Sequence, residues 1–227
     1  METLSENRAF GGTQGVYRHA SKATGTDMTF GLFLPQEAAD LPVPVLWFLS
    51  GLTCTHENAM VKAGAQLWAT EDLPAAVFEH FALDEGRQAI TGHSMGGHGA
   101  LTIAMTLPDR FASVSAFAPI CNPTDSDWGR KQFTAYLGGD EADWAAHDAT
   151  HLMRQAGFPG PVLIDTGTAD QFGDLLKTEA LAQAIAARRQ HATLRLQPGY
   201  DHSYFFISTF MEDHINFHAE ALYGVAE

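Results

Sequence analysis

A five-residue pattern between two apolar stretches constrains this chain more than any other feature. Gly92–Gly96 reads G-H-S-M-G, and it follows a short apolar strand expected at 88–91 and precedes a helix expected from Met95. At such a junction the pattern predicts a sharp turn that strains the backbone of Ser94 and projects its hydroxyl above the sheet. Glycines at both ends let neighbouring backbone pass close by without a Cβ clash. We interpret Ser94 as a nucleophile; a glycine-rich turn with a surface serine is the alternative.

Strands and helices alternate along most of the chain. Strands are expected at 45–49, 88–91, 112–120, 162–165 and 193–197, and helices at 57–68, 72–81, 95–107, 175–189 and 203–223. An antiparallel hairpin is expected from 16–20 and 28–34, and 121–160 is interpreted as rich in loops. The alternation predicts an α/β protein with a mostly parallel, doubly wound sheet. Together with the serine turn it indicates an α/β-hydrolase fold with an N-terminal antiparallel hairpin, as a single domain over 1–227.

One junction departs from this alternation. The helix expected to end near Trp68 meets the helix expected from Asp72, where a strand should stand. A sheet that lacks a central strand leaves backbone groups unpaired. Either a segment is left out of the sequence near residues 66–72, or the protein is a deletion variant with a rebuilt sheet. We expect the first, with Cα atoms there farther apart than the roughly 3.8 Å of a peptide link and an intact mass above 24.6 kDa.

The composition limits the kinds of partner and the cellular compartment that we expect for this chain. The formal net charge is −14, which argues against nucleic acid or an anionic membrane surface as a partner. The first residues carry no basic cluster, and no apolar run approaches the roughly 18 residues of a membrane span. Two cysteines, Cys54 and Cys121, do not make a disulfide framework. We therefore expect reduced thiols and a cytoplasmic protein.

A serine nucleophile needs a base and an acid that orients the base. In this fold the three residues follow the chain order serine, acid, histidine. His202 lies in the loop after the last strand and is the expected base, while Asp170 lies in the loop after 162–165 and is the expected acid. Asp165 is a rival that closes its strand, and Asp201 is poorly placed because it is adjacent to the histidine.

The negatively charged oxygen that forms during the reaction needs N–H donors to stabilise it. The amide of Met95, directly after the serine, is one expected donor, and the amide of Leu52, in the loop after 45–49, is the other.

Two histidines of the last expected helix have the spacing of metal ligands. His214 and His218 are four residues apart, a spacing that can hold a metal. No third ligand accompanies them, so we interpret them as a solvated helix face and expect no metal and no cofactor.

Several longer blocks resemble one family. They are Ser50–Thr55, Ser113–Cys121, Trp128–Phe133, Gly167–Phe172 and Gly199–Phe206, together with the serine turn. With them the chain closely resembles the S-formylglutathione hydrolase (esterase D) family over nearly its whole length. The resemblance implies a cytoplasmic serine thioesterase that releases formate from S-formylglutathione, with Ser94, Asp170 and His202 as the triad. Family members carry a strand and an active-site loop at the junction near residue 70, which this chain lacks.

Several residues are expected to line the substrate pocket, and several functions compete with the thioesterase. The resemblance implies that Cys54 lies near the site, and the narrow acyl pocket is expected to draw walls from His93, His98 or Trp128. Local steering of an anionic glutathione thioester is expected from Lys62, Arg130 or Lys131. A general short-chain carboxylesterase, an acyltransferase on the same fold and an inactive scaffold protein are the alternatives. A homodimer is left open.

Overall fold

The computed structural model describes residues 1–51 and 73–224. These residues fall into two compact units: 1–45 and 73–87 lie in the first, and 46–51 and 88–224 lie in the second. The helix expected at 57–68 and the expected break at 66–72 lie outside the described residues. Leu52, Cys54 and Lys62 lie outside them as well, so their predicted roles stay predictions.

The first unit contains a three-stranded antiparallel sheet. Its strands are β1 (Glu2–Ala9), β2 (Gly12–Ala20) and β3 (Asp27–Leu34), in the order β1-β2-β3. The predicted hairpin is confirmed as β2 and β3. The prediction missed β1, because its side chains are almost all exposed and show no apolar alternation. Phe10 and Gly11, both with positive φ, join β1 to β2, and a two-residue turn of this kind suits the twist of a hairpin.

An aromatic cluster forms the core of this unit. Tyr17 of β2 is 2% exposed and packs with its ring centroid 5.7 Å from Phe30 and 5.0 Å from Phe81. Phe81 directly follows α2 (Leu73–His80), which buries Leu73 and Val77. A short 3₁₀ helix, η1 (Gln36–Ala39), follows β3. Tyr17 and Phe30 are cross-strand partners, so the buried aromatic side chains of this core lie on one face of the sheet.

A five-stranded sheet in the order β4-β5-β6-β7-β8 carries the second unit. The strands are β4 (Val43–Leu49), β5 (Leu83–Gly92), β6 (Val114–Phe117), β7 (Val162–Gly167) and β8 (Ala192–Gln197). Parallel pairing joins β5 to β6, β6 to β7 and β7 to β8. The predicted α/β class and mostly parallel sheet are confirmed. Every residue of β6 and β7 is buried, as expected of strands that are covered on both faces.

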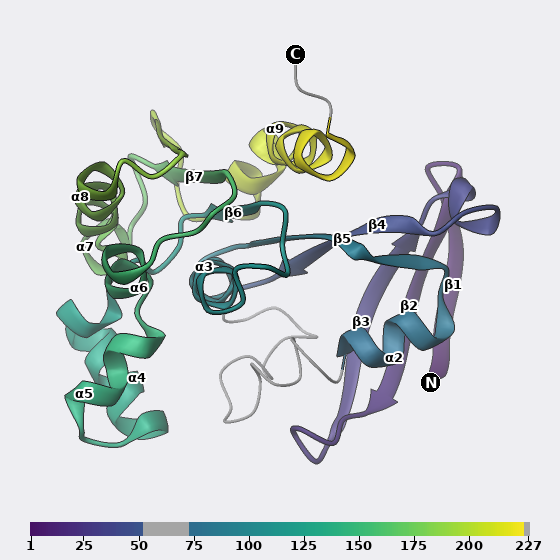
Figure 1. Ribbon diagram of the computed structural model, residues 1–227, viewed down its shortest axis with the longest axis horizontal. Helices are drawn as coiled ribbons and strands as arrows, with labels where there is room; N and C mark the ends of the chain where they lie inside the picture. Colours follow the sequence, from purple (N-terminus) through teal and green to yellow (C-terminus); the bar gives the residue numbers. More distant parts are fainter. Residues whose placement is uncertain (52–72, 225–227) are drawn as a thin grey trace. The chain divides into compact units, whose positions relative to one another are not determined.

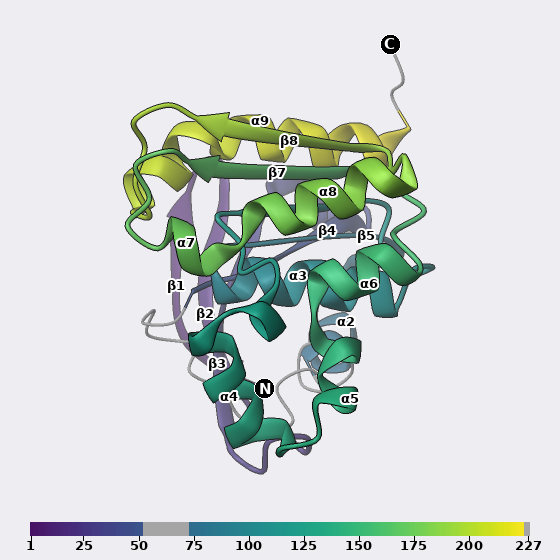
Figure 2. The ribbon, with the colours of Figure 1, turned by 90° about the vertical axis from the view of Figure 1, so that its left-hand side faces the viewer.

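Helices cover both faces of this sheet. Figures 1 and 2 show α9 (Tyr204–Tyr223) on one face and α3 (Met95–Thr106) with α8 (Thr178–Arg188) on the other. A one-turn helix, α7 (Gly173–Leu176), precedes α8. The expected single helix at 175–189 is interrupted because Lys177 adopts a left-handed conformation, with φ 55°. No helix in the described ranges is long and apolar enough to cross a membrane.

The interpretation of 121–160 as mostly loop is wrong. The segment holds η4 (Pro123–Asp125), α4 (Asp127–Leu137), α5 (Glu141–Trp144), η5 (Ala145–His147) and α6 (Ala149–Gln155). Side-chain caps start three of these helices: Ser126 accepts from Gly129 N, Asp140 from Ala142 N, and Asp148 from two amides. Each cap accepts a hydrogen bond from N–H groups of the first turn, which have no partner within the helix, and so stabilises these short helices.

The interpretation of His214 and His218 as a solvated helix face is also wrong. Both are 1% exposed, on the side of α9 that packs on β6 and β7. His218 lies between Ser113, the residue before β6, and Ser115 of β6, with Nδ1 2.8 Å from Ser113 Oγ and Nε2 2.8 Å from Ser115 Oγ. His214 Nδ1 lies 2.8 Å from Ser115 Oγ. Serine hydroxyls satisfy these imidazoles, which removes the usual cost of burying them.

A buried ion pair extends this histidine network to β7 and β8. The carboxylate of Asp165 is fully buried; it accepts from Arg195 Nε at 2.7 Å and Gln197 Nε2 at 3.1 Å, and lies 3.2 Å from His214 Nε2. Arg195 also pairs with Asp213 at 2.7 Å. Strands β5, β6, β7 and β8 are thus tied to α9 by one polar network, since Ser115 Oγ also donates to Thr91 Oγ1.

Loss of stability in mild acid is expected from His218. Burial, and then the neighbouring His214, lower the pKa of His218 to about 3. Because an unfolded histidine titrates near about 6.5, the unfolded chain binds a proton below that pH that the folded chain does not bind. This residue alone should therefore remove about 1.4 kcal/mol of stability for each pH unit below about 6.5. Urea unfolding between pH 7 and 4 measures the slope.

The matched variants are His218→Gln and His191→Gln. His191 is exposed, so its replacement should leave the slope unchanged, whereas His218→Gln should flatten it. Equal slopes in the wild-type protein and His218→Gln would contradict a neutral buried imidazole at this position.

Candidate active site

Ser94 lies on a strained turn between β5 and α3. It has φ 57° and ψ −117°, a combination that residues with a Cβ rarely adopt. Its N–H donates to Phe117 O at 2.9 Å, and the N–H of His93 donates to Leu49 O at 2.9 Å. Two neighbouring strands therefore hold the turn by its backbone, so the hydroxyl is positioned by the sheet.

Two glycines make this turn sterically possible. A Cβ on Gly92 would lie 2.3 Å from Gly96 O, and a Cβ on Gly96 would lie 2.1 Å from Leu49 O. Both contacts are with backbone atoms, which a rotamer change cannot relieve. The spacing of the motif is thus required by the packing of β5 and α3 against the end of β4.

The loop after β4 reaches the serine. A Cβ on Gly51 would lie 3.1 Å from His93 Nδ1 and 3.4 Å from Ser94 Cβ. The predicted oxyanion donor Leu52 is the next residue and lies outside the described residues. Met95 is the first residue of α3, and the first N–H groups of a helix have no partner within it. The helix dipole also favours negative charge at this end, where an oxyanion would form.

The structure brings the predicted base, His202, and the predicted acid, Asp170, into hydrogen-bond contact. His202 Nδ1 lies 2.6 Å from Asp170 Oδ2, and their side chains are 10% and 0% exposed. The second carboxylate oxygen of Asp170 accepts from Phe172 N at 2.8 Å. Asp170 comes from the loop after β7 and His202 from the loop after β8, so neighbouring parallel strands deliver both to one edge of the sheet. The hydrogen bond fixes the imidazole so that Nε2 is free to act as a base.

The rival carboxylates are engaged elsewhere. Asp165 belongs to the buried network with Arg195 and His214. Asp201 accepts hydrogen bonds from the N–H and the hydroxyl of Ser203 at 3.0 and 2.6 Å. In the described part of the chain neither carboxylate is hydrogen-bonded to the His202 ring, so the geometry favours Asp170 among the acids considered.

His202 lies beside the serine turn. Its ring centroid is 4.6 Å from that of His93, the residue before Ser94, and 5.1 Å from that of Phe172. Among the described residues, no hydrogen bond joins His202 to Ser94. The serine–histidine bond of such sites often tightens only when substrate is bound.

His93 adds a neutral ring to the site. It is 5% exposed, and among residues 1–51 and 73–224 neither ring nitrogen has a hydrogen-bond partner. Burial, followed by the nearby His202, lowers the pKa of His93 to about 4. The ring is therefore uncharged near neutral pH and does not compete with His202 for a proton. Its role as a wall of the acyl pocket stays a prediction.

The other predicted pocket residues lie in different surroundings. Trp128 is half-buried against the apolar cluster of Phe117, Ile120 and Phe206, which Met95 also contacts. Lys131 is exposed on α4. His98 is held by Ile120 O, 2.8 Å from its Nδ1. Cys121 is fully buried, and burial raises the pKa of its thiol to about 12, so it is no candidate for reactivity.

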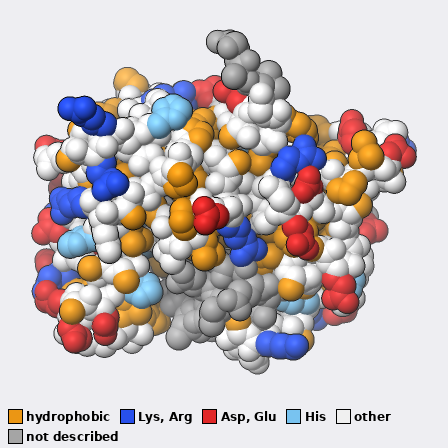
Figure 3. All heavy atoms as spheres, viewed as in Figure 1, with side chains coloured by type: hydrophobic (Ala, Val, Ile, Leu, Met, Phe, Trp, Pro, Cys, Tyr) orange, Lys and Arg blue, Asp and Glu red, His pale blue; other side chains and the backbone are white. Residues whose placement is uncertain are grey.

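Neither the surface charge nor any cluster of metal-binding side chains indicates a second functional site among the described residues. On the face that Figure 3 shows, acidic and basic side chains are interspersed. In the described ranges, no group of three or more His, Cys, Asp or Glu side chains is arranged to hold a metal ion. The fold, the strained serine and the paired histidine and aspartate define a serine hydrolase of the α/β-hydrolase class.

The chain belongs to the Esterase family. The family model matches residues 21–72 and 66–217, in two stretches that meet at the unusual junction. The chain is 56% identical to an S-formylglutathione hydrolase of Paracoccus denitrificans over 273 aligned positions, covering 97% of this chain and 98% of the relative. Since 273 positions exceed the 227 residues present here, the relative carries residues that this chain lacks.

Solved structures agree with this class. An S-formylglutathione hydrolase from Agrobacterium tumefaciens is 40% identical and has a TM-score of 0.91, covering 98% of this chain and 100% of its own. A fluorophosphonate-binding serine hydrolase of Staphylococcus aureus is 18% identical, with a TM-score of 0.77 over 92% of this chain and 98% of its own. The second likeness shows the shared fold alone.

Proposed function

We propose that the chain is a thioesterase that hydrolyses S-formylglutathione to glutathione and formate, with Ser94, His202 and Asp170 as its triad. The observation that carries the proposal is the 2.6 Å contact of His202 with Asp170 beside the strained serine turn. The two similar hydrolases named for this reaction, one 56% and one 40% identical, supply the substrate class.

The first half of the reaction makes an acyl-enzyme. His202 Nε2 takes the proton of Ser94 Oγ, and the oxygen bonds to the formyl carbon. The negative charge moves to the carbonyl oxygen, where the amides of Met95 and Leu52 stabilise it. The carbon–sulfur bond then breaks, and the proton passes from His202 to the sulfur. A thiol pKa near about 8.5 makes this sulfur a good leaving group.

The second half frees the enzyme. His202 takes a proton from water, and the resulting oxygen bonds to the formyl carbon. The bond from this carbon to Ser94 Oγ breaks, Oγ regains its proton from His202, and formate leaves. Asp170 stabilises the imidazolium in both halves through its bond to Nδ1. The neutral His93 beside His202 adds no opposing charge when that imidazolium forms.

Substrate preference tests this function. We expect kcat/KM for S-formylglutathione to exceed that for p-nitrophenyl acetate by about 100-fold or more, because binding energy from the glutathione part can be used in the transition state. A higher value for the p-nitrophenyl ester would favour the general carboxylesterase. Diversion of the formyl group to an added alcohol would favour the acyltransferase. Failure of a fluorophosphonate to label Ser94 would indicate an inactive scaffold.

We further propose that the natural chain carries a segment near residues 66–72 that is absent here. Two findings support this: the family model matches in two stretches that meet at those residues, and the alignment with the Paracoccus relative is longer than this chain. A cytoplasmic location and a soluble glutathione thioester as partner are consistent with the substrate proposed. The intact mass of the protein from its natural source, compared with 24.6 kDa, tests the segment.

A further inference from the structure

The chain directly after β6 makes a turn beside the nucleophile. Phe117, the last residue of β6, accepts a hydrogen bond from Ser94 N at 2.9 Å. Three residues later, Ile120 N donates to Ser94 O at 3.3 Å. Residues 117–120, which we call the β6 turn, therefore contact the backbone of Ser94 on both its N–H and its C=O side.

The β6 turn contains a strained residue in the core. Ala118 has φ 41° and is fully buried, and Pro119 follows it. A positive φ is uncommon for a residue with a Cβ and persists only where the surrounding structure fixes it. Strand β7 supplies one such constraint, because Ala118 N donates to Asp165 O at 2.7 Å. The shape of the turn is therefore set by its neighbours and not by the local preference of its residues.

The carbonyl of Ser94 fixes the direction of the proposed oxyanion donor. Ser94 and Met95 are joined by a trans peptide, in which C=O and N–H point in opposite directions. Two donors hold Ser94 O from different elements: His98 N of α3 at 2.9 Å and Ile120 N of the β6 turn at 3.3 Å. Since the peptide group is planar, these two bonds also orient the N–H of Met95.

One side chain connects α3 to the β6 turn. The Nδ1 of His98 lies 2.8 Å from Ile120 O, and a carbonyl oxygen only accepts, so Nδ1 carries the proton of this bond. The ring thus holds the C=O of Ile120, while the N–H of the same residue bonds to Ser94 O. Gly97 permits the close approach of the turn, because a Cβ there would lie 3.1 Å from Pro119 Cβ.

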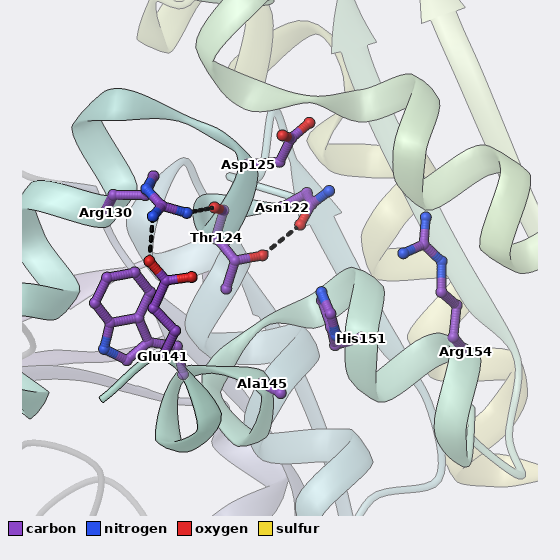
Figure 4. Close-up of a pocket in the computed structure, with 9 residues that line it drawn as sticks. Asn122, Thr124, Asp125, Arg130, Glu141, Ala145, His151 and Arg154 are labelled. Atoms are coloured by element: carbon purple, nitrogen blue, oxygen red, sulfur yellow. Dashed lines mark hydrogen bonds and ion pairs between the residues drawn. The ribbon is translucent and has the colours of Figure 1, made fainter. Parts of the chain in front are cut away.

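The far end of the β6 turn is anchored as well. Cys121 N donates to Leu176 O at 2.7 Å, and Cys121 O accepts from Thr150 N at 3.0 Å and Thr150 Oγ1 at 2.8 Å. The chain then enters helices that line a cavity of about 430 Å³, where Figure 4 shows Asn122 hydrogen-bonded to Thr124. The bond from His98 therefore acts on a turn whose two ends are already held.

We propose that His98 is a positioning residue of the reaction: its ring holds Ile120, and Ile120 N–H with the His98 amide orients the Ser94–Met95 peptide so that the Met95 N–H points to the oxyanion. The inference rests on the proposed function for the roles of Ser94 and Met95, and it requires no particular acyl group. His98, which the sequence suggested as a wall of the acyl pocket, thereby acts through the backbone of the nucleophile.

His98→Leu tests this role, because it removes the donor and keeps an apolar side chain at the position. The rate constant for labelling of Ser94 by a fluorophosphonate, and kcat/KM for p-nitrophenyl acetate, should each fall about tenfold. Complete loss of an oxyanion donor costs about 10²–10³-fold, and a misdirected donor costs part of that. The rate constant refers to the molecules that label, so an unfolded fraction lowers only the extent of labelling.

His98→Asn and Thr102→Val are the matched variants. The Nδ2 of asparagine occupies nearly the position of histidine Nδ1 and also donates, so His98→Asn should stay within about twofold of the wild-type rate constant. Thr102→Val removes a hydroxyl that donates to His98 O at 3.1 Å and Gly99 O at 3.2 Å, a loss in the same helix that does not involve Ile120. Its labelling rate constant should equal that of the wild-type protein.

Three results would overturn the positioning role: a wild-type labelling rate constant in His98→Leu, an equal fall in His98→Leu and Thr102→Val, or no recovery in His98→Asn. The proposed function is tested separately. If the wild-type protein did not hydrolyse S-formylglutathione but His98→Leu still lowered the labelling rate constant, the proposed substrate would be wrong and the role of His98 would stand.

Discussion

Ser94→Gly is expected to abolish hydrolysis and to give a more stable protein than Ser94→Ala. Loss of the nucleophile in a serine triad lowers kcat about 10⁶-fold, and both variants lose the hydroxyl. They differ in the backbone, because φ 57° and ψ −117° at this position cost a residue with a Cβ about 1–3 kcal/mol. Glycine relieves that strain but makes the unfolded chain more flexible, so the net gain over alanine is about 1 kcal/mol.

Urea unfolding of the two variants measures this difference, and turnover with fluorophosphonate labelling confirms that both are inactive. Ser208→Ala, on the exposed side of α9, is the control and should keep both activity and stability. If glycine were no more stable than alanine at position 94, the turn would not store strain. Activity retained in Ser94→Ala would show that another residue is the nucleophile.

The serine turn could be predicted because its determinants are local. Gly92 and Gly96 are required by contacts with backbone only a few residues away or at the end of one neighbouring strand. The chain order of Asp170 and His202 is equally constrained, because parallel strands deliver their following loops to one edge. These features depend on topology and spacing, which a single sequence displays.

The burial of His214 and His218 could not be predicted in the same way. Spacing of four residues places them on one face of a helix but does not say which face meets the sheet. The burial depends on two buried serines about 100 residues earlier in the chain, Ser113 just before β6 and Ser115 within it, which hydrogen-bond to the imidazoles. The helices of 121–160 were missed for a related reason: Asp148 bonds both Thr124 and His151, and only the folded chain brings these residues together.

Asp165→Ala is expected to cost the most stability of any single change considered in the buried network. Removing one partner of a buried ion pair costs about 3–5 kcal/mol. The lower value is expected here because Arg195 is 32% exposed and keeps Asp213. Even about 3 kcal/mol is a large share of the 5–15 kcal/mol that a typical domain has.

The acid dependence of this loss has a definite sign. Burial alone would raise the pKa of Asp165, but hydrogen bonds from His214, Arg195 and Gln197 outweigh it and lower the pKa to about 2. An unfolded aspartate titrates near about 3.9, so the stability from Asp165 is present above that pH and is lost as the pH falls toward 2. The difference in stability between wild-type and Asp165→Ala proteins should therefore shrink as the pH falls from about 4 and vanish only below about pH 2, as unfolding titrations can show.

Asp170→Asn is expected to lower activity strongly and stability little, the reverse of Asp165→Ala. The pair of variants therefore shows which aspartate is the acid of the triad. Its partner His202 is at the edge of the sheet, so the fold should lose about 1 kcal/mol or less, whereas kcat should fall about 10⁴-fold because the imidazole adopts the wrong tautomer. Asp165→Ala that remains folded should keep near wild-type kcat, since no contact joins its network to His202 in the described residues. If Asp165→Ala instead lost turnover while its unfolding midpoint was unchanged, the acid of the triad would be Asp165.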